Sequence, residues 1–334
     1  MSVDQARRLQ EALDRHRAGE LDAAAEIYRE LLERQPECAD AWHLLGLTEH
    51  QRGRSERAVT LIERAVGLAP RTASFRANLG NALRASGRAE EAVASLKEAL
   101  ELDPRDAAGW SNLGHALRAA ARDAEAVEAF REALAVEPGL TEARFNLAST
   151  LHARGELAEA TRHYRQVLEE RSDLEAAREG LAEAHRMLGD LLSQDDRLEE
   201  AVAAHRKAAE ALPEDLEAHK RLGDLLHSLG RLDEAEQAYQ RALGIDPQAW
   251  TVHNSLGGLH VRRGDKQKAL ESFRKALVPE PRVEPLNNLG VLLRRLGRLE
   301  EATRPLKLAI KLDPDHSQAS NNLAITEADQ GRLH

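Results

Sequence analysis

The sequence predicts an all-α solenoid built from antiparallel helix pairs, and three observations support this fold class. Prolines are evenly spaced, at Pro36, Pro70, Pro104 and Pro138 and, with the same interval, at Pro213, Pro247 and Pro281. Isolated glycines stand between them, where each first helix must turn into its second, and apolar residues follow a helical spacing. A fixed period, here the interval from Pro36 to Pro70, marks one structural unit that stacks on its neighbours. The period therefore determines the fold of the whole chain.

Residues 107–138 show the elements of one unit in order. The first helix has apolar or small residues at helical spacing, at Trp110, Leu113, Gly114 and Leu117. Residues 121–123 make the turn, where Ala121 replaces the usual glycine. The second helix has a buried face of Ala126, Phe130 and Ala133. Pro138 ends this helix because proline cannot continue the hydrogen-bond pattern.

These columns resemble the tetratricopeptide repeat, whose pattern is W-x2-L-G-x2-Y, then A-x3-F, then P. The resemblance is carried by Trp42, Leu45, Gly46, Ala58 and Pro70, by Leu79, Gly80, Ala92 and Pro104, by Leu222, Gly223, Ala235, Tyr239, Ala242 and Pro247, and by Leu256, Gly257, Ala269, Phe273, Ala276 and Pro281. It covers residues 4–334 as a single array of about nine repeats and a final unpaired helix at 315–330. The resemblance implies a right-handed superhelix whose first helices line a concave groove.

Composition excludes several other classes of protein. The net charge of −10, with both signs well mixed, argues against a nucleic-acid surface. Cys38 is the only cysteine, so no intrachain disulfide can form. No stretch of 18 apolar residues occurs and the N-terminus has no apolar core of signal-peptide length, so we expect no membrane span and a cytoplasmic location.

The period is broken by seven extra residues between Pro138 and Pro213. Seven residues are close to two helical turns, so an insertion of that length keeps the apolar face in phase. We therefore expect an elongated first helix at 174–194. Two interpretations stay open: a neutral expansion, or a dimer contact or docking spur.

The end of the array is also incomplete. Residues 331–334 repeat the sequence of the turns at 230–232 and 297–299, so the chain stops where another second helix would begin. The final helix either caps the array or precedes a catalytic domain in a longer protein.

One column of the first helices carries amides immediately before the Leu-Gly or Leu-Ala step: Asn78, Asn112, Asn146, Asn288 and Asn322. An amide both donates and accepts, so a ladder of amides can hold an extended backbone of any sequence. The arrangement is similar to the superhelix of O-linked N-acetylglucosamine transferases, which implies that these asparagines hold a peptide. Other residues interrupt the ladder at Leu44, Gly180, Arg221 and Ser255. Alternatively, the asparagines are spacers that form hydrogen bonds within the array.

A second column follows six residues later and is basic, with Arg84, Arg118, His152, His227 and Arg294. Asn81 and His115 lie midway between the columns, and Arg221 takes the asparagine position of its own repeat. Together they predict a basic and amide-rich stripe that favours an acidic or phosphorylated segment. The alternative is an ordinary solvated face.

The sequence contains no constellation typical of catalysis. Histidine pairs such as His43 and His50 lie two turns apart, too far to chelate a metal without a third ligand between them, and no His-Glu-x2-His motif occurs. The glycines are isolated turn markers, so there is no phosphate-binding loop. We expect no cofactor, no metal and no enzymatic activity.

The sequence therefore predicts a non-catalytic protein–protein interaction scaffold that binds an extended polypeptide in its groove. A second hypothesis is a substrate-recruiting arm of a glycosyltransferase or sulfotransferase whose catalytic domain is missing or separately encoded. A third is self-association through 174–194 or through the C-terminal helix.

Overall fold

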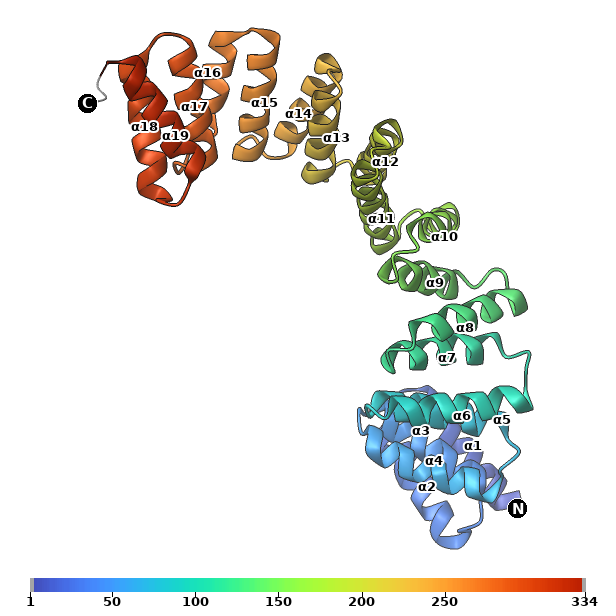
Figure 1. Cartoon of the computed structure of the whole chain (residues 1–334). Coiled ribbons are helices and arrows are strands. Elements are labelled where there is room, and N and C mark those ends of the chain that lie inside the picture. The colour runs from blue at the N-terminus through green and yellow to red at the C-terminus, as the bar shows by residue number, and fades with distance from the viewer. Residues whose placement is uncertain (1–2, 332–334) are drawn as a thin grey trace. The chain divides into compact units, whose positions relative to one another are not determined.

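The structure is a computed structural model that describes residues 3–331, and within this range every regular element is an α-helix (Figure 1). The described residues fall into two compact units, one ending at Ala177 and the other beginning at Arg178. Within each unit successive helices pack as antiparallel pairs joined by short turns. The all-α solenoid predicted from the sequence is confirmed.

The first unit contains five helix pairs, α1 (Val3–Arg17) with α2 (Leu21–Arg34), α3 (Ala39–Gln51) with α4 (Ser55–Leu68), α5 (Ala73–Ala85) with α6 (Ala89–Leu102), α7 (Ala107–Ala119) with α8 (Asp123–Val136), and α9 (Thr141–Ala153) with α10 (Leu157–Glu170). Helix α11 (Glu175–Gln194) crosses the boundary between the units. The second unit continues with α12 (Leu198–Ala211), α13 (Leu216–Ser228), α14 (Leu232–Ile245), α15 (Trp250–Arg263), α16 (Lys266–Lys275), α17 (Val283–Arg295), α18 (Leu299–Leu312) and α19 (Ser317–Asp329).

The turn inside each pair needs one residue in the left-handed backbone region. Glycine supplies it in most pairs, for example Gly87 with φ +84°, because glycine has no Cβ to clash there. Two pairs use other residues, Ala121 with φ 57° and Asp196 with φ 61°. The turn predicted at 121–123 is therefore present, and an alanine accepts the strained conformation.

Close packing within a pair depends on a small residue on the first helix that faces a large one on the second. A Cβ added to Gly114 would lie 2.6 Å from the ring of Phe130, and one added to Gly223 would lie 2.6 Å from the ring of Tyr239. Since atoms cannot approach so closely, glycine here is required by space and not by backbone angle. Phe130 and Tyr239 are both fully buried.

Six of the prolines that follow a second helix also accept a hydrogen bond from the next first helix. Trp42 donates from its indole to the carbonyl oxygen of Pro36 at 2.7 Å, six residues earlier. The same bond recurs with different donors, from Arg76 to Pro70, Trp110 to Pro104, Arg144 to Pro138, His219 to Pro213 and His253 to Pro247. The tryptophan of the repeat pattern thus serves as a hydrogen-bond donor, and arginine or histidine can replace it.

Two helices depart from the usual length. Helix α11 has 20 residues, whereas the other first helices have 13 to 15. Helix α16 ends at Lys275 and has only 10 residues. Its early end follows from Pro279, two residues before the periodic Pro281, because proline disfavours helix in the residues before it.

No helix among the described residues combines the length and the apolar character needed to cross a membrane. The repeat of the turn sequence at Arg332, Leu333 and His334 lies outside the described residues.

Candidate functional site

All residues of the predicted groove lie on first helices. They are Asn78, Asn81 and Arg84 on α5, Asn112, His115 and Arg118 on α7, Asn146 and His152 on α9, Arg221 and His227 on α13, Asn288 and Arg294 on α17, and Asn322 on α19. The structure brings those of α5, α7 and α9 together in the first unit. Those of α13, α17 and α19 belong to the second unit.

In the first unit, Asn78 and Asn146 form hydrogen bonds to the first helix of the preceding repeat. The amide nitrogen of Asn78 donates to Nε2 of His43 at 2.9 Å, and that of Asn146 lies 3.2 Å from Nε2 of His115. His43 also stacks on Phe75, with ring centroids 4.3 Å apart. Burial lowers the pKa of His43 to about 4, so the ring is neutral and its Nε2 accepts the hydrogen bond from the amide N–H.

The second unit repeats the pattern with amides on both sides. Asn288 donates to Oδ1 of Asn254 at 3.0 Å, and Asn322 donates to Oδ1 of Asn287 at 2.8 Å. In both units the ladder therefore connects adjacent repeats, which is the spacer role. Each NH₂ group has a second N–H and each amide has an oxygen, so the ladder retains capacity for a ligand.

Two asparagines of the first unit differ from the others. Asn112 is half-buried and makes no side-chain hydrogen bond within residues 3–331. Asn81, one turn after Asn78, has a buried Oδ1 without a partner among these residues. A buried polar atom without a partner costs free energy, so this acceptor is available to a donor from a ligand.

The basic column of the first unit is not neutralised by the protein itself. Arg84 and Arg118 form no ion pair with any described residue. Burial lowers the pKa of His115, and the charges of Arg84 and Arg118 lower it further. His152 packs edge-on against Tyr164, with centroids 6.2 Å apart. The face of α5, α7 and α9 therefore presents two permanent positive charges beside amide groups and the His115 imidazole, whose pKa is lowered.

The arginines of the second unit are in ion pairs. Arg221 contacts Asp190 at 2.9 Å and Glu217 at 2.9 Å, and Arg294 contacts Asp329 at 3.3 Å. Burial lowers the pKa of His227. The two units thus share the column pattern but not its charge.

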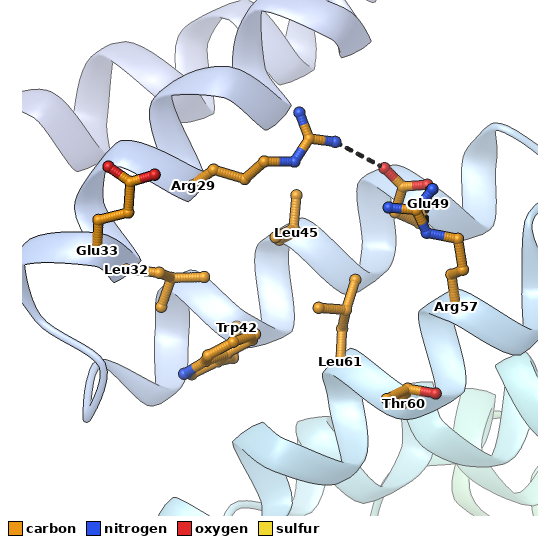
Figure 2. A pocket seen from close by; sticks show the side chains of 9 residues that line it. All are labelled: Arg29, Leu32, Glu33, Trp42, Leu45, Glu49, Arg57, Thr60 and Leu61. Atoms are coloured by element: carbon orange, nitrogen blue, oxygen red, sulfur yellow. Dashed lines mark hydrogen bonds and ion pairs between the residues drawn. The ribbon is translucent and has the colours of Figure 1, made fainter.

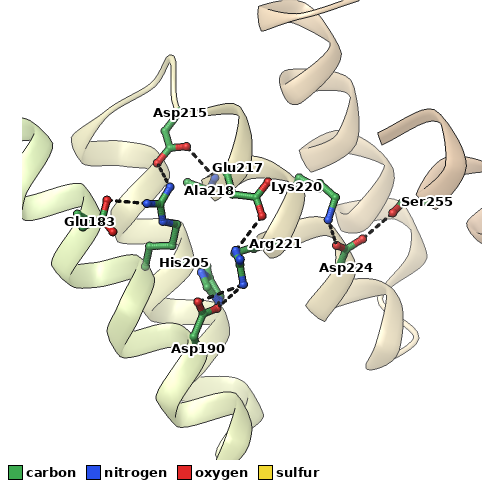
Figure 3. Close-up of polar contacts among 11 residues, drawn as sticks. Glu183, Asp190, His205, Asp215, Glu217, Ala218, Lys220, Arg221, Asp224 and Ser255 are labelled. Atoms are coloured by element: carbon green, nitrogen blue, oxygen red, sulfur yellow. Dashed lines mark hydrogen bonds and ion pairs between the residues drawn. The ribbon is translucent and has the colours of Figure 1, made fainter. Parts of the chain in front are cut away.

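On α11 and α13, acidic residues stand at the positions of Asn81 and His115, namely Asp190 and Asp224 (Figure 3). Asp224 accepts at one oxygen from the phenol of Tyr239 at 2.7 Å and from Ser255 at 2.8 Å, and at the other from Lys220 at 2.7 Å. Asp190, one repeat earlier in the same column, lies against Arg221. Asp190 and Asp224 therefore pair with groups of the protein itself.

Many of the histidines have structural roles. His205 is buried opposite Gly189 in the place of the aromatic residue of other repeats, and burial lowers its pKa. His219 and His253 bond to proline carbonyls. Over residues 3–331, His, Cys, Asp and Glu form no cluster that could hold a metal ion.

Family models identify the repeats. The tetratricopeptide repeat model matches residues 9–73, 111–175, 186–249, 255–315 and 287–333, and a second TPR repeat model matches 80–120. These matches cover more than half of the sequence, and the chain belongs to the tetratricopeptide repeat family. Tetratricopeptide repeats bind protein partners, so the chain is a protein–protein interaction scaffold. None of the curated proteins matches the chain significantly.

Two of the solved structures that resemble the chain are named as TPR proteins. The C-terminal part of a TPR repeat-containing protein from Cytophaga hutchinsonii is 14% identical, with a TM-score of 0.58, over 74% of this chain and 99% of that chain. MamA is 21% identical, with a TM-score of 0.46, over 52% and 96%. A thermophilic TPR protein from Thermus thermophilus is 25% identical, with a TM-score of 0.44, over 54% and 98%. The Cytophaga structure shows that the fold is shared.

The sequence analysis missed three acidic residues that shape these surfaces, Asp190, Asp224 and Glu49. Their signal was present in the columns. Asp190 and Asp224 are one period apart and replace amide or imidazole, while Glu49 stands where several other repeats have leucine. The partners of the asparagine ladder, His43 and Asn254, gave no comparable signal because their pairing depends on how adjacent helices are offset.

Proposed function

We propose that the chain is a non-catalytic scaffold that binds an extended polypeptide along the first helices α5, α7 and α9. The observation that carries the proposal is the contrast between free and paired arginines. Arg84 and Arg118 have no carboxylate partner among the described residues, whereas Arg221 and Arg294 are in ion pairs. A partner that supplies carboxylates can form new ion pairs with Arg84 and Arg118. At Arg221 and Arg294 it would have to displace the carboxylates that already pair with them.

The amides would bind the backbone of this polypeptide. Asn112 has both its donors and its acceptor available, and Asn81 offers a buried acceptor. Such groups pair with peptide N–H and C=O groups without regard to the side chains. Binding would therefore select an extended conformation through the amides and an acidic sequence through Arg84 and Arg118.

The charge of the partner follows from the same face. Arg84 and Arg118 occupy the same column in successive repeats, on the neighbouring first helices α5 and α7. Guanidinium groups pair with carboxylate or phosphate in a planar, bidentate geometry. An extended segment with acidic or phosphorylated residues fits this spacing of charges.

The test is a binding measurement on the double variant Arg84→Ala/Arg118→Ala. The partner segment is recovered by crosslinking in the native host, and its affinity is measured by titration calorimetry. We expect a loss of roughly tenfold or more, since each ion pair with a partly desolvated guanidinium contributes about 1 kcal/mol.

Arg105→Ala is the matched control, because Arg105 is exposed and lies in the loop between α6 and α7. It should leave the affinity unchanged. If the double variant binds as tightly as the parent protein while Asn112→Ala also has no effect, the peptide lies elsewhere and the proposal fails.

A further inference from the structure

A pocket of about 510 Å³ is lined by α2, α3 and α4 of the first unit, and none of its lining residues belongs to the proposed peptide face (Figure 2). Leu32, Leu45 and Leu61 form its apolar wall together with the half-buried indole of Trp42. Arg29 and Arg57 also line it. The pocket therefore combines an aromatic and aliphatic surface with guanidinium groups.

The charged end of the pocket is built around Glu49, which is fully buried. In four other first helices the equivalent residue is a buried leucine, Leu83, Leu117, Leu151 or Leu226. Glu49 accepts from Arg52 at 2.8 Å and from Arg54 at 3.1 Å. Burial by itself raises the pKa of Glu49, but these hydrogen bonds and the nearby charge of Arg57 outweigh it and hold the pKa below its ordinary value.

One carboxylate cannot neutralise the arginines that converge on it. Arg29 approaches Glu49 at 3.3 Å and Arg57 at 3.8 Å, so four guanidinium groups surround two oxygens. Arg52 has a second partner in Asp22. The side chains of Arg29 and Arg57 remain 44% and 62% exposed, so both keep N–H donors that face solvent. Glu33, at the other end of the pocket, adds one exposed negative charge there.

We propose that this pocket docks a peptide segment in which a bulky apolar side chain is followed by side-chain carboxylates. The apolar side chain lies on Trp42 and Leu61, and the carboxylates pair with Arg29 and Arg57. Glu49 acts as a positioning residue that draws the guanidinium groups toward the apolar wall. The surface is separate from the peptide face of α5, α7 and α9, so the protein would bind two segments at once.

The chain contains its own comparison site two repeats further along. A second pocket lies between α6 and α8, where Trp110 and Leu113 repeat Trp42 and Leu45. Its charges are different, because Glu125 replaces Arg57 and Leu117 replaces Glu49. Arg122 and Lys97 pair with Glu125, so the positive charges near it are neutralised. The two pockets share the tryptophan and one leucine of the wall, whereas Ala129 takes the place of Leu61 in the second. Only the first should accept an acidic segment.

The experiment uses tryptophan fluorescence in the full chain. The variant Trp110→Phe/Trp250→Phe leaves Trp42 as the reporter, and Trp42→Phe/Trp250→Phe leaves Trp110. The probe is the blocked peptide acetyl-Gly-Phe-Asp-Asp-Gly-amide, whose only carboxylates are on side chains. Its controls are the same peptide with Asn-Asn for Asp-Asp and the same peptide with Gly for Phe. Circular dichroism checks that each variant is folded.

We expect a saturable blue shift of Trp42 emission with the acidic probe, weakened roughly tenfold by Arg29→Gln/Arg57→Gln and by added salt. The control peptides and the Trp110 reporter should give no saturable change. An equal response to the Asn-Asn peptide, an equal response at Trp110, or no saturation at millimolar probe overturns the proposal. Arg84→Ala/Arg118→Ala should leave the Trp42 response unchanged, which separates this site from the peptide face.

Discussion

The amide of Asn78 donates to Nε2 of His43 across 35 residues of sequence, and this bond fixes the imidazole of one repeat from the next. The ring can accept only while it is neutral. Burial already disfavours its protonated form, and a proton on Nε2 would break the bond as well. The contact between repeats is therefore coupled to pH.

We expect stability to fall as the pH drops from 6.5 to about 4. Unfolded His43 binds a proton near pH 6.5, whereas folded His43 does so near pH 4. Because the unfolded state binds more protons in this window, the free energy of unfolding is greatest above pH 6.5. The contribution of His43 to the free energy of unfolding decreases by about 3 kcal/mol as the pH approaches 4.

The measurement is urea unfolding followed by circular dichroism at pH 7.5, 6 and 5. His43→Gln keeps an acceptor for Asn78 but removes the titration, so its pH dependence should be shallower than that of the parent. Parallel curves for the two proteins would show that His43 does not contribute. Burial also lowers the pKa values of His115, His163, His205, His227 and His260, so these residues contribute to the remaining slope.

Ala121→Gly should stabilise the first unit. Ala121 has φ 57°, a conformation that costs a non-glycine residue about 1 kcal/mol. Glycine occupies this position in most other pairs, so the substitution removes strain at the turn between α7 and α8. A rise in the midpoint of urea unfolding tests this, and Ala120→Gly, at a residue with φ −86°, should lower the midpoint instead.

The same chemical change should have opposite effects at two glycines. Gly114→Ala places a methyl group 2.6 Å from Phe130 and should destabilise by about 1–3 kcal/mol through overpacking. Gly67→Ala, near the end of α4 with nothing within 4 Å, should stabilise by about 0.5–1 kcal/mol because alanine favours helix. Equal effects at both sites would contradict the packing argument.

Asp224→Ala should be among the most damaging single changes in the second unit. It removes the acceptor for the fully buried Tyr239 and for Ser255, and leaves Lys220 without its partner. Loss of a partner for a buried hydroxyl costs about 1–3 kcal/mol. Tyr239→Phe should cost less in the Asp224→Ala background than alone, and additive costs in this double-mutant cycle would show that the contact contributes nothing.

Much of the fold could be predicted from the sequence because one period specifies it. The prolines, the turn glycines and the Gly114–Phe130 step each recur in register, and each position has one physical requirement that few residue types meet. The early end of α16 was not predicted, because the period places the end of this helix just before Pro281. Pro279, two residues earlier, ends the helix sooner.

The candidate site was only partly predictable. The sequence indicated which face Asn78 and Arg84 occupy, since the helical period fixes that. It did not indicate that His43 would accept a hydrogen bond from Asn78, or that Asp190 would form an ion pair with Arg221. Each of these contacts joins residues of different repeats. The offset between neighbouring helices, which depends on packing, decides such pairs.

The donors to the proline carbonyls alternate in the first unit, with Trp42 followed by Arg76, Trp110 and Arg144. The two tryptophan pockets are likewise two repeats apart. In this unit the backbone therefore repeats with every helix pair, whereas these side chains repeat with every second pair. A shortened or lengthened protein should therefore be designed in modules of four helices. Removing a single pair would bring two repeats of the same kind into contact, so each would meet side chains that it does not contact in the intact array.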